Sequence, residues 1–151
     1  DARFHAKLCK CARGTDRLAM GAALETASLE LPLREKLALA ISQQNGCAYC
    51  LSAHSVIAKM AGVPPEAIRD ARAGLATAGR EAAAVALAKS LVEKRGWIDD
   101  AELAGYRAQG LTDGEIVEVL AVVAQTTFSN YTNHLAHTPI DFPLAEGLPQ
   151  K

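Results

Sequence analysis

The regular placement of helix start and stop signals is the feature that most constrains what this chain can fold into. Prolines suited to first helical positions and glycines suited to helix ends divide the sequence into segments of ordinary helix length. Apolar residues recur within these segments at helical spacing, whereas few windows alternate apolar and polar residues as strands do. The signals predict six helices, over about 32–45, 47–61, 64–74, 80–95, 99–110 and 112–139.

Two of these predicted helices begin with the spacing of a capping box, Asp99 with Glu102 and Thr112 with Glu115. No linker, low-complexity segment or clear repeat separates the helices, so we predict a single all-α domain over residues 1–151. The last helix is apolar on more than one face, and such a helix lies either in the centre of a core or against another subunit. We therefore expect helix-mediated association into a homo-oligomer.

The net charge and the hydropathy of the sequence argue against two classes of partner, nucleic acid and membranes. The net charge of -1 gives no electrostatic reason to expect nucleic acid or an anionic membrane as a partner. No window approaches the roughly 18 to 20 apolar residues that a membrane span needs. The first residues, from Asp1 to Phe4, lack the apolar region of a secretory signal. We expect no nucleic acid partner, no membrane association and a cytoplasmic location.

The stretch 45-NGCAYCLSAH-54 holds the candidate chemistry. Cys47 and Cys50 form a CxxC pair directly after an Asn-Gly helix break, and His54 follows one helical turn later. On a helix that begins at Cys47 the three side chains share one face. Cys47 stands at the start of this helix, where unpaired backbone N–H groups favour negative charge, so a thiolate there is stabilised. A CxxC pair at a helix start has a lowered thiol pKa. The stretch predicts a reactive thiol pair beside an imidazole that can take or supply a proton.

Other interpretations of the same residues exist. Free cysteines and a histidine can simply pack in a core. A c-type haem site needs histidine directly after the second cysteine, where Leu51 stands, and a thioredoxin-type motif follows a strand, which nothing before Cys47 predicts. A structural zinc site is the main alternative, because Cys9 and Cys11 could complete four thiolates, although their CxC spacing is unusually tight. We expect no metal and no cofactor.

Glu35 can approach His54 if the helices on either side of Asn45-Gly46 fold back on each other. At 1.5 Å of rise per residue, Glu35 lies about 15 Å and His54 about 10 Å from the corner. A carboxylate beside an imidazole fixes its tautomer. A second interpretation is that Glu35 only stabilises the first turn of its own helix, where a carboxylate is favourable. Spacing alone leaves both interpretations open.

The combination of motifs resembles the alkylhydroperoxidase D-like branch of the carboxymuconolactone decarboxylase superfamily. The residues that carry the resemblance are Glu35, Cys47, Tyr49, Cys50 and His54. The similarity extends over 31-LPLREKLALAISQQNGCAYCLSAHS-55, and 126-TTFSNYTNHLAHTPIDFP-143 is similar to the family's C-terminal segment. The glutamate, CxxC and histidine at these spacings are fairly specific, whereas CxxC alone is not. The decarboxylase branch lacks this CxxC, which argues against a lactone decarboxylase.

The resemblance implies an all-helical fold that assembles as trimers or hexamers, with thiol peroxidase activity on hydroperoxides. By position, it implies that Cys50 attacks the peroxide and becomes a sulfenic acid, and that Cys47 resolves this to a disulfide. Glu35 and His54 would form the proton relay. Tyr49 stands where the best-studied branch has a second histidine; it would mostly donate a hydrogen bond, and an ideal helix points it away from the other residues. A thiol or dithiol reductant must then restore the pair.

Two competing functions remain at this stage. One is a dithiol–disulfide oxidoreductase that acts on another disulfide, and the other is a zinc-bound or redox-sensing protein without catalysis. His134 and His137 are spaced to share a helical face, either as metal ligands or as C-terminal histidines favoured by the helix dipole. Cys9 and Cys11 are not part of the family pattern, and their role is open.

Overall fold

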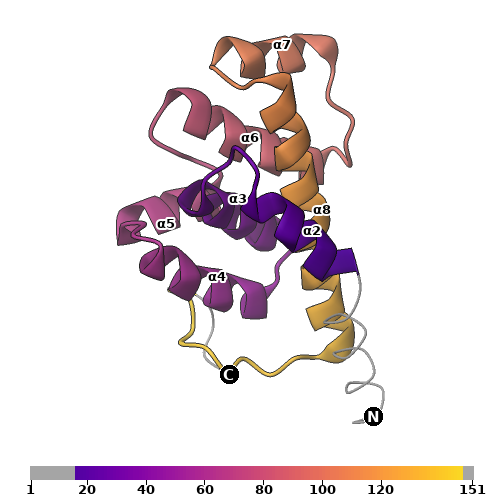
Figure 1. The fold of residues 1–151 in the computed structure, drawn as a ribbon. Coiled ribbons are helices and arrows are strands. Elements are labelled where there is room, and N and C mark those ends of the chain that lie inside the picture. Colours follow the sequence, from indigo (N-terminus) through magenta and orange to yellow (C-terminus); the bar gives the residue numbers. More distant parts are fainter. Residues whose placement is uncertain (1–15, 148–151) are drawn as a thin grey trace.

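Helices build the part of the chain that the computed structural model describes, residues 16–147, and no strand occurs there. In order they are α2 (Asp16–Glu25), α3 (Leu31–Gln44), α4 (Ala48–Met60), α5 (Pro65–Ala73), α6 (Gly79–Glu93), α7 (Asp100–Ala108) and α8 (Asp113–Ala136). Figure 1 shows α3 in the middle of the molecule, with α4 and α6 on opposite sides of it. The long helix α8 runs down one side of the molecule and crosses α3 there. The predicted all-helical fold is confirmed.

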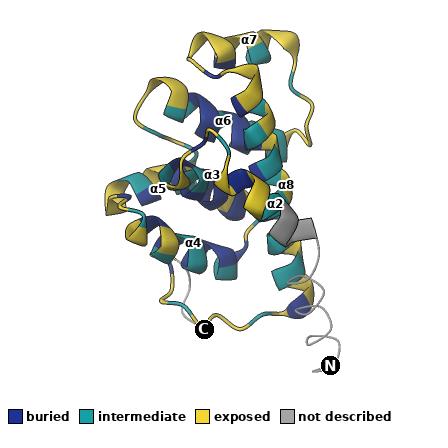
Figure 2. Ribbon diagram, viewed as in Figure 1, coloured by how far each residue is buried: buried dark blue, intermediate teal, exposed yellow. Residues whose placement is uncertain are grey.

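The central helix α3 is covered on several sides, and this explains its sequence. Leu33, Leu37 and Ile41 pack into a core shared with α2, α6 and α8, whereas Leu39 belongs to a second core shared with α4 and α5. In Figure 2 most of α3 is drawn as buried. A helix surrounded by neighbours is apolar around most of its circumference, rather than along one stripe. The position of α3 in the core therefore sets where the turn between α3 and α4 lies.

The helix ends agree with most of the predicted signals. Thr112 caps α8 in a reciprocal capping box with Glu115, as expected, and the Asp99 carboxylate accepts the backbone N–H of Glu102 at 2.8 Å. The expected stop of α8 at Pro139 is wrong. The helix ends at Ala136, because His137 adopts a left-handed conformation (φ 48°) and its N–H bonds back to the preceding turn.

Helix α2 was not predicted from the sequence. It packs against α8, and Gly21 lies at the contact. A Cβ atom at this position would come within 2.9 Å of the Gln125 side-chain nitrogen, so the end of that flexible side chain would have to shift. Glycine inside a helix normally weakens it. Here the helix depends on a tertiary contact that local signals do not reveal.

The long helix α8 has one buried face and one exposed apolar face. Val119 and Val122 point into the core that includes α3 and α6. Large apolar side chains are exposed along the rest of the helix: Val117, Leu120, Phe128, Tyr131 and Leu135. The prediction of apolar residues on more than one face is therefore confirmed. Neither α8 nor any other helix within residues 16–147 is long and apolar enough to cross a membrane.

The segment after α8 turns back along α4 and is fixed there by hydrogen bonds. The Ala145 N–H donates to the buried Ser52 hydroxyl at 3.2 Å, and that hydroxyl donates to the Ala48 carbonyl at 2.9 Å. Arg72 on α5 donates to the Glu146 carbonyl oxygen at 2.6 Å. The segment thus forms one wall of the region where α4 begins.

Candidate dithiol site

The CxxC pair lies at the turn between α3 and α4. Gly46 adopts a left-handed conformation (φ 68°) that reverses the chain after Asn45, the C-cap of α3. Cys47 is the N-cap of α4 rather than its first residue, and its sulfur accepts the Cys50 N–H at 3.4 Å. Both cysteines are free thiols, with exposed fractions of 1% for Cys47 and 3% for Cys50. The turn therefore holds two buried thiols next to each other.

Glu35 and His54 meet across the hairpin of α3 and α4. The Oε2 atom of Glu35 lies 2.7 Å from Nδ1 of His54, which is a hydrogen bond of the short, charge-assisted kind. Glu35 is buried, whereas His54 is only half-buried. With Nδ1–H donated to the carboxylate, the Nε2 atom is the one free to exchange a proton. The proximity expected from helix geometry is confirmed.

Two asparagines of α8 complete the surroundings of the thiols, and their places were not predicted from the sequence. The Asn133 amide donates to the Cys50 sulfur at 3.2 Å. Asn130 is fully buried, donates to the Ser42 hydroxyl at 3.1 Å and accepts from the Asn45 amide at 2.9 Å. Asn130 thereby ties α8 to the end of α3. The spacing of Asn130 and Asn133, three apart and so on one face of the helix, was the signal that could have found them.

The surroundings shift the pKa values of the two thiols in opposite directions. The hydrogen bond from the Cys47 thiol is the largest cause that lowers the pKa of Cys50, from 9.0 to about 6. The amides of Asn130 and Asn133 and the charge of His54 lower it further, against the opposing effect of burial. The same hydrogen bond to Cys50, together with burial, raises the pKa of Cys47. The backbone N–H at the helix start lowers the Cys47 pKa, as expected, but the hydrogen bond to Cys50 and burial outweigh it, so the thiolate is favoured on Cys50 instead.

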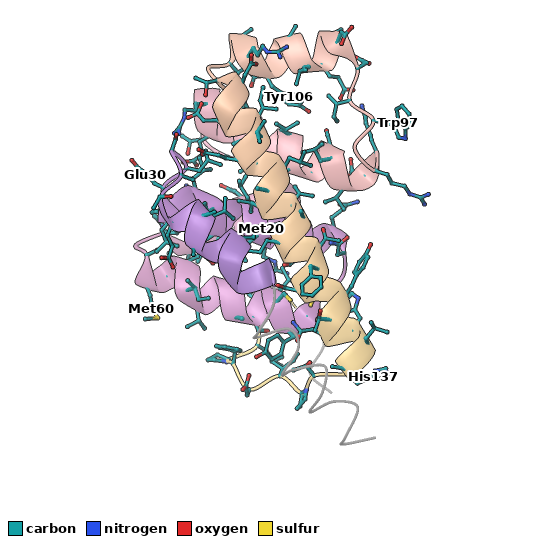
Figure 3. The ribbon with its side chains drawn as sticks, turned by 45° about the vertical axis from the view of Figure 1, so that its right-hand side comes forward. Met20, Glu30, Met60, Trp97, Tyr106 and His137 are labelled. Carbon is teal, nitrogen blue, oxygen red and sulfur yellow. The ribbon has the colours of Figure 1, made fainter. Side chains whose placement is uncertain are left out.

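Tyr49 lies away from the Glu35–His54 pair. Its ring packs edge-on against Phe142 of the C-terminal segment, with centroids 5.6 Å apart. Tyr49 and Cys47 line a cavity of about 670 Å³ at the start of α4. His134 and His137, at the end of α8, line the same cavity, and Figure 3 shows His137 at the end of that helix. The two histidines do not share a helical face, because His137 lies beyond the last helical residue.

No metal site is apparent in the described part of the chain. Within residues 16–147, no group of three or more histidine, cysteine, aspartate or glutamate side chains is arranged to hold a metal ion. Cys9 and Cys11, the cysteines that the zinc interpretation requires, lie outside the described residues.

The fold and the site define a helical protein with a buried dithiol between a histidine–carboxylate pair and two amides. The chain belongs to the carboxymuconolactone decarboxylase family, whose family model matches residues 10–93, more than half of the sequence. The family predicted from the sequence motifs is confirmed. No curated protein is similar enough to the sequence to count as a match.

Solved structures with the same fold include two bacterial proteins described as peroxidase-related. One, from Silicibacter sp. TM1040, superposes with a TM-score of 0.74 at 20% sequence identity, over 82% of this chain and 67% of that one. The other, from Ralstonia eutropha JMP134, is described as an alkylhydroperoxidase AhpD core. It has a TM-score of 0.72 at 21% identity, over 86% of this chain and 69% of that one. These similarities establish the alkylhydroperoxidase D-like fold.

Proposed function

We propose that the protein is a thiol-dependent peroxidase that reduces hydroperoxides through a Cys47–Cys50 dithiol–disulfide cycle. The observation that carries the proposal is the environment of the Cys50 sulfur. It accepts the Asn133 amide at 3.2 Å, and the Cys50 pKa is lowered to about 6. A thiolate that is populated at neutral pH is the form that attacks a peroxide. Membership of the family and the two peroxidase-related neighbours of the same fold agree with this proposal.

The proposed reaction runs in two steps. The Cys50 thiolate attacks one peroxide oxygen, the O–O bond breaks, and the leaving alkoxide takes a proton from His54, one turn further along α4. Cys50 is then a sulfenic acid. The Cys47 sulfur attacks the Cys50 sulfur and gives up its proton, hydroxide leaves and takes that proton to become water, and the disulfide forms. Glu35 holds the His54 ring through Nδ1 during both transfers. In sum, a hydroperoxide and two thiols give an alcohol, water and a disulfide.

The proposal predicts fast oxidation of this one pair. We would use a Cys9→Ser/Cys11→Ser variant, so that Cys47 and Cys50 are the only thiols in the chain. Stopped-flow measurement after mixing with tert-butyl hydroperoxide or hydrogen peroxide should show rapid loss of both thiols, and peptide mapping should show a Cys47–Cys50 disulfide. Loss no faster than that of a free cysteine at the same pH would exclude peroxidase function.

The lowered pKa of Cys50 predicts a specific pH dependence. The rate of Cys50 alkylation by iodoacetamide, followed by peptide mapping, should rise with pH and level off above a midpoint near 6. Asn133→Ala should move this midpoint upward by about one unit, because the thiolate loses a hydrogen bond worth about 1.5 kcal/mol. Thr132→Ala is the matched control, since its hydroxyl bonds to the Phe128 carbonyl of its own helix. An unchanged midpoint in Asn133→Ala would contradict the role of the amide.

A dithiol–disulfide oxidoreductase is the second candidate function, and the cavity beside Cys47 favours it. A volume of about 670 Å³ exceeds what a small peroxide requires and could admit part of a disulfide substrate. Rates with tert-butyl hydroperoxide and with a disulfide such as oxidised glutathione, measured on the same preparation, distinguish the two functions.

We also propose that the chain forms a homo-oligomer through the exposed apolar face of α8. Phe128, Tyr131 and Leu135 are each about half exposed or more, and exposed apolar patches of this kind commonly mark interaction sites. The trimer or hexamer implied by the family resemblance stays a prediction. So do the cytoplasmic location, the absence of nucleic acid and membrane partners, and the thiol or dithiol reductant.

A further inference from the structure

Asn130 has hydrogen-bonding capacity beyond its two contacts with other polar side chains. It is fully buried, its amide donates to the Ser42 hydroxyl at 3.1 Å, and its carbonyl oxygen accepts the Asn45 amide at 2.9 Å. An asparagine amide carries two N–H groups, so one remains after the bond to Ser42. This N–H is directed to the CxxC pair, because hydrogen bonds from Asn130 lower the pKa of both Cys47 and Cys50.

The backbone of the turn holds Cys47 beside Asn130. The Cys47 N–H donates to the Ser42 carbonyl oxygen at 2.9 Å, and the hydroxyl of the same serine accepts the Asn130 amide. Asn45, which donates to Asn130, stands just before Gly46 and Cys47 in the chain. Cys47 is only 1% exposed, so water contributes little to the solvation of a charge on its sulfur. A thiolate at Cys47 therefore depends on hydrogen-bond donors of the protein.

In the resting pair the proton stays on Cys47, and oxidation of Cys50 removes the main reason. The hydrogen bond to Cys50 is the largest cause of the raised Cys47 pKa, because the Cys47 proton is shared with the neighbouring thiolate. Once Cys50 is a neutral sulfenic acid, that negative charge is gone. Two donors that lower the Cys47 pKa then remain, the Cys50 backbone N–H, 3.4 Å from the Cys47 sulfur, and the Asn130 amide.

We propose that Asn130 is a catalytic residue of the second step, in which its amide N–H stabilises negative charge on the Cys47 sulfur as this sulfur attacks oxidised Cys50. The inference rests on the proposed dithiol–disulfide cycle and assigns an amide donor to each of its steps. In the second step the Cys47 S–H bond breaks, the S–S bond forms and the S–O bond of Cys50 breaks. The leaving hydroxide takes the proton and becomes water. Asn133, 3.2 Å from the Cys50 sulfur, serves the first step, and Asn130 serves the second.

The contact between Asn130 and Cys47 can be tested without peroxide. In a Cys9→Ser/Cys11→Ser/Cys50→Ser variant, Cys47 is the single thiol, and the ultraviolet absorbance of its thiolate gives a titration midpoint. Adding Asn130→Ala should raise this midpoint by about one pH unit, because the buried thiolate loses a hydrogen bond. Asn130→Asp keeps the volume and the carbonyl acceptor but replaces the amide with a carboxylate, so it should raise the midpoint further. An unchanged midpoint in either variant would overturn the proposal.

Single-turnover kinetics then locate the effect in the second step. At about pH 8, Cys50 stays ionised even if its pKa rises by about one unit from about 6, so the first step depends little on Asn130. The Cys9→Ser/Cys11→Ser variant, with and without Asn130→Ala, is mixed with hydrogen peroxide and quenched with dimedone at successive times. Asn130→Ala should accumulate the dimedone adduct on Cys50 and form the disulfide about tenfold more slowly, since about tenfold less Cys47 is ionised.

Ser42→Ala is the matched control for a purely structural role of the asparagine. It removes the buried hydroxyl that Asn130 contacts at 3.1 Å but leaves the amide itself in place. Disulfide formation in Ser42→Ala should stay close to the wild-type rate. Equal slowing in Ser42→Ala and Asn130→Ala would overturn the proposal, because it would mean that Asn130 acts only by packing. If peroxide does not oxidise Cys50 at all, the proposed function fails, whereas the Cys47 titration still decides the role of Asn130.

Discussion

Replacing Cys50 with serine is expected to reduce peroxide turnover to the level of a protein-free blank. Cys50 is the thiol with the lowered pKa, and its sulfur accepts the Asn133 amide. A serine hydroxyl at the same place is not ionised at neutral pH and cannot form a sulfenic acid. The thiol that remains, Cys47, has a raised pKa and cannot replace it as the attacking thiolate. Turnover is measured as loss of tert-butyl hydroperoxide in the presence of excess dithiothreitol.

The Cys47→Ser variant is the matched control, and it is expected to react with peroxide once, whereas Cys50→Ser should not react. It removes the resolving thiol but leaves the Asn133 contact with Cys50 in place. It should react once with peroxide and stop at the sulfenic acid, which dimedone traps as a mass adduct on Cys50. Loss of the hydrogen bond from Cys47 should also slow this single reaction, because that bond is the largest cause of the lowered Cys50 pKa. Full turnover in Cys50→Ser, or a dimedone adduct on Cys47 in the wild type, would contradict the assignment.

The parts of the site that the sequence predicts are those that lie close together in the chain. Cys47, Cys50 and His54 lie within three turns of one helix and its cap, so backbone geometry alone brings them together. Glu35 is reached through a single turn at Gly46, and antiparallel helices joined by a short turn are neighbours. These relations depend on local structure, which proline, glycine and capping residues specify.

The missed parts depend on how distant helices pack. Asn133 lies 83 residues from Cys50 in the chain, and Asn130 lies 88 residues from Ser42. Nothing in local spacing determines which face of α8 meets the start of α4. The same reason explains why α2, which packs against α8, was not predicted, and why the Cys47 pKa is raised despite its place at the helix start. A helix start supplies the same backbone field to both cysteines, and the tertiary donors decide which of them carries the charge.

Removing the imidazole is expected to have the second-largest effect on catalysis. His54→Ala should lower the rate constant for Cys50 oxidation by about 100-fold, the lower end of the range for a lost general acid. Glu35→Gln should lower it by less, about tenfold, because the amide keeps the volume but no longer fixes the ring by a charge-assisted hydrogen bond. Single-turnover stopped-flow measurements give these rate constants without interference from the reductant.

The double variant Glu35→Gln/His54→Ala tests whether the two residues act as one unit. Glu35 contacts His54 at 2.7 Å and acts on the reaction through that ring, so its loss should add nothing once the ring is absent. The double variant should then match His54→Ala rather than lose the product of both effects. Glu66→Gln on the exposed first turn of α5 is the matched control for removing one carboxylate, and it should react at the wild-type rate. Multiplying effects in the double variant would mean that Glu35 stabilises the hairpin of α3 and α4 without supporting proton transfer.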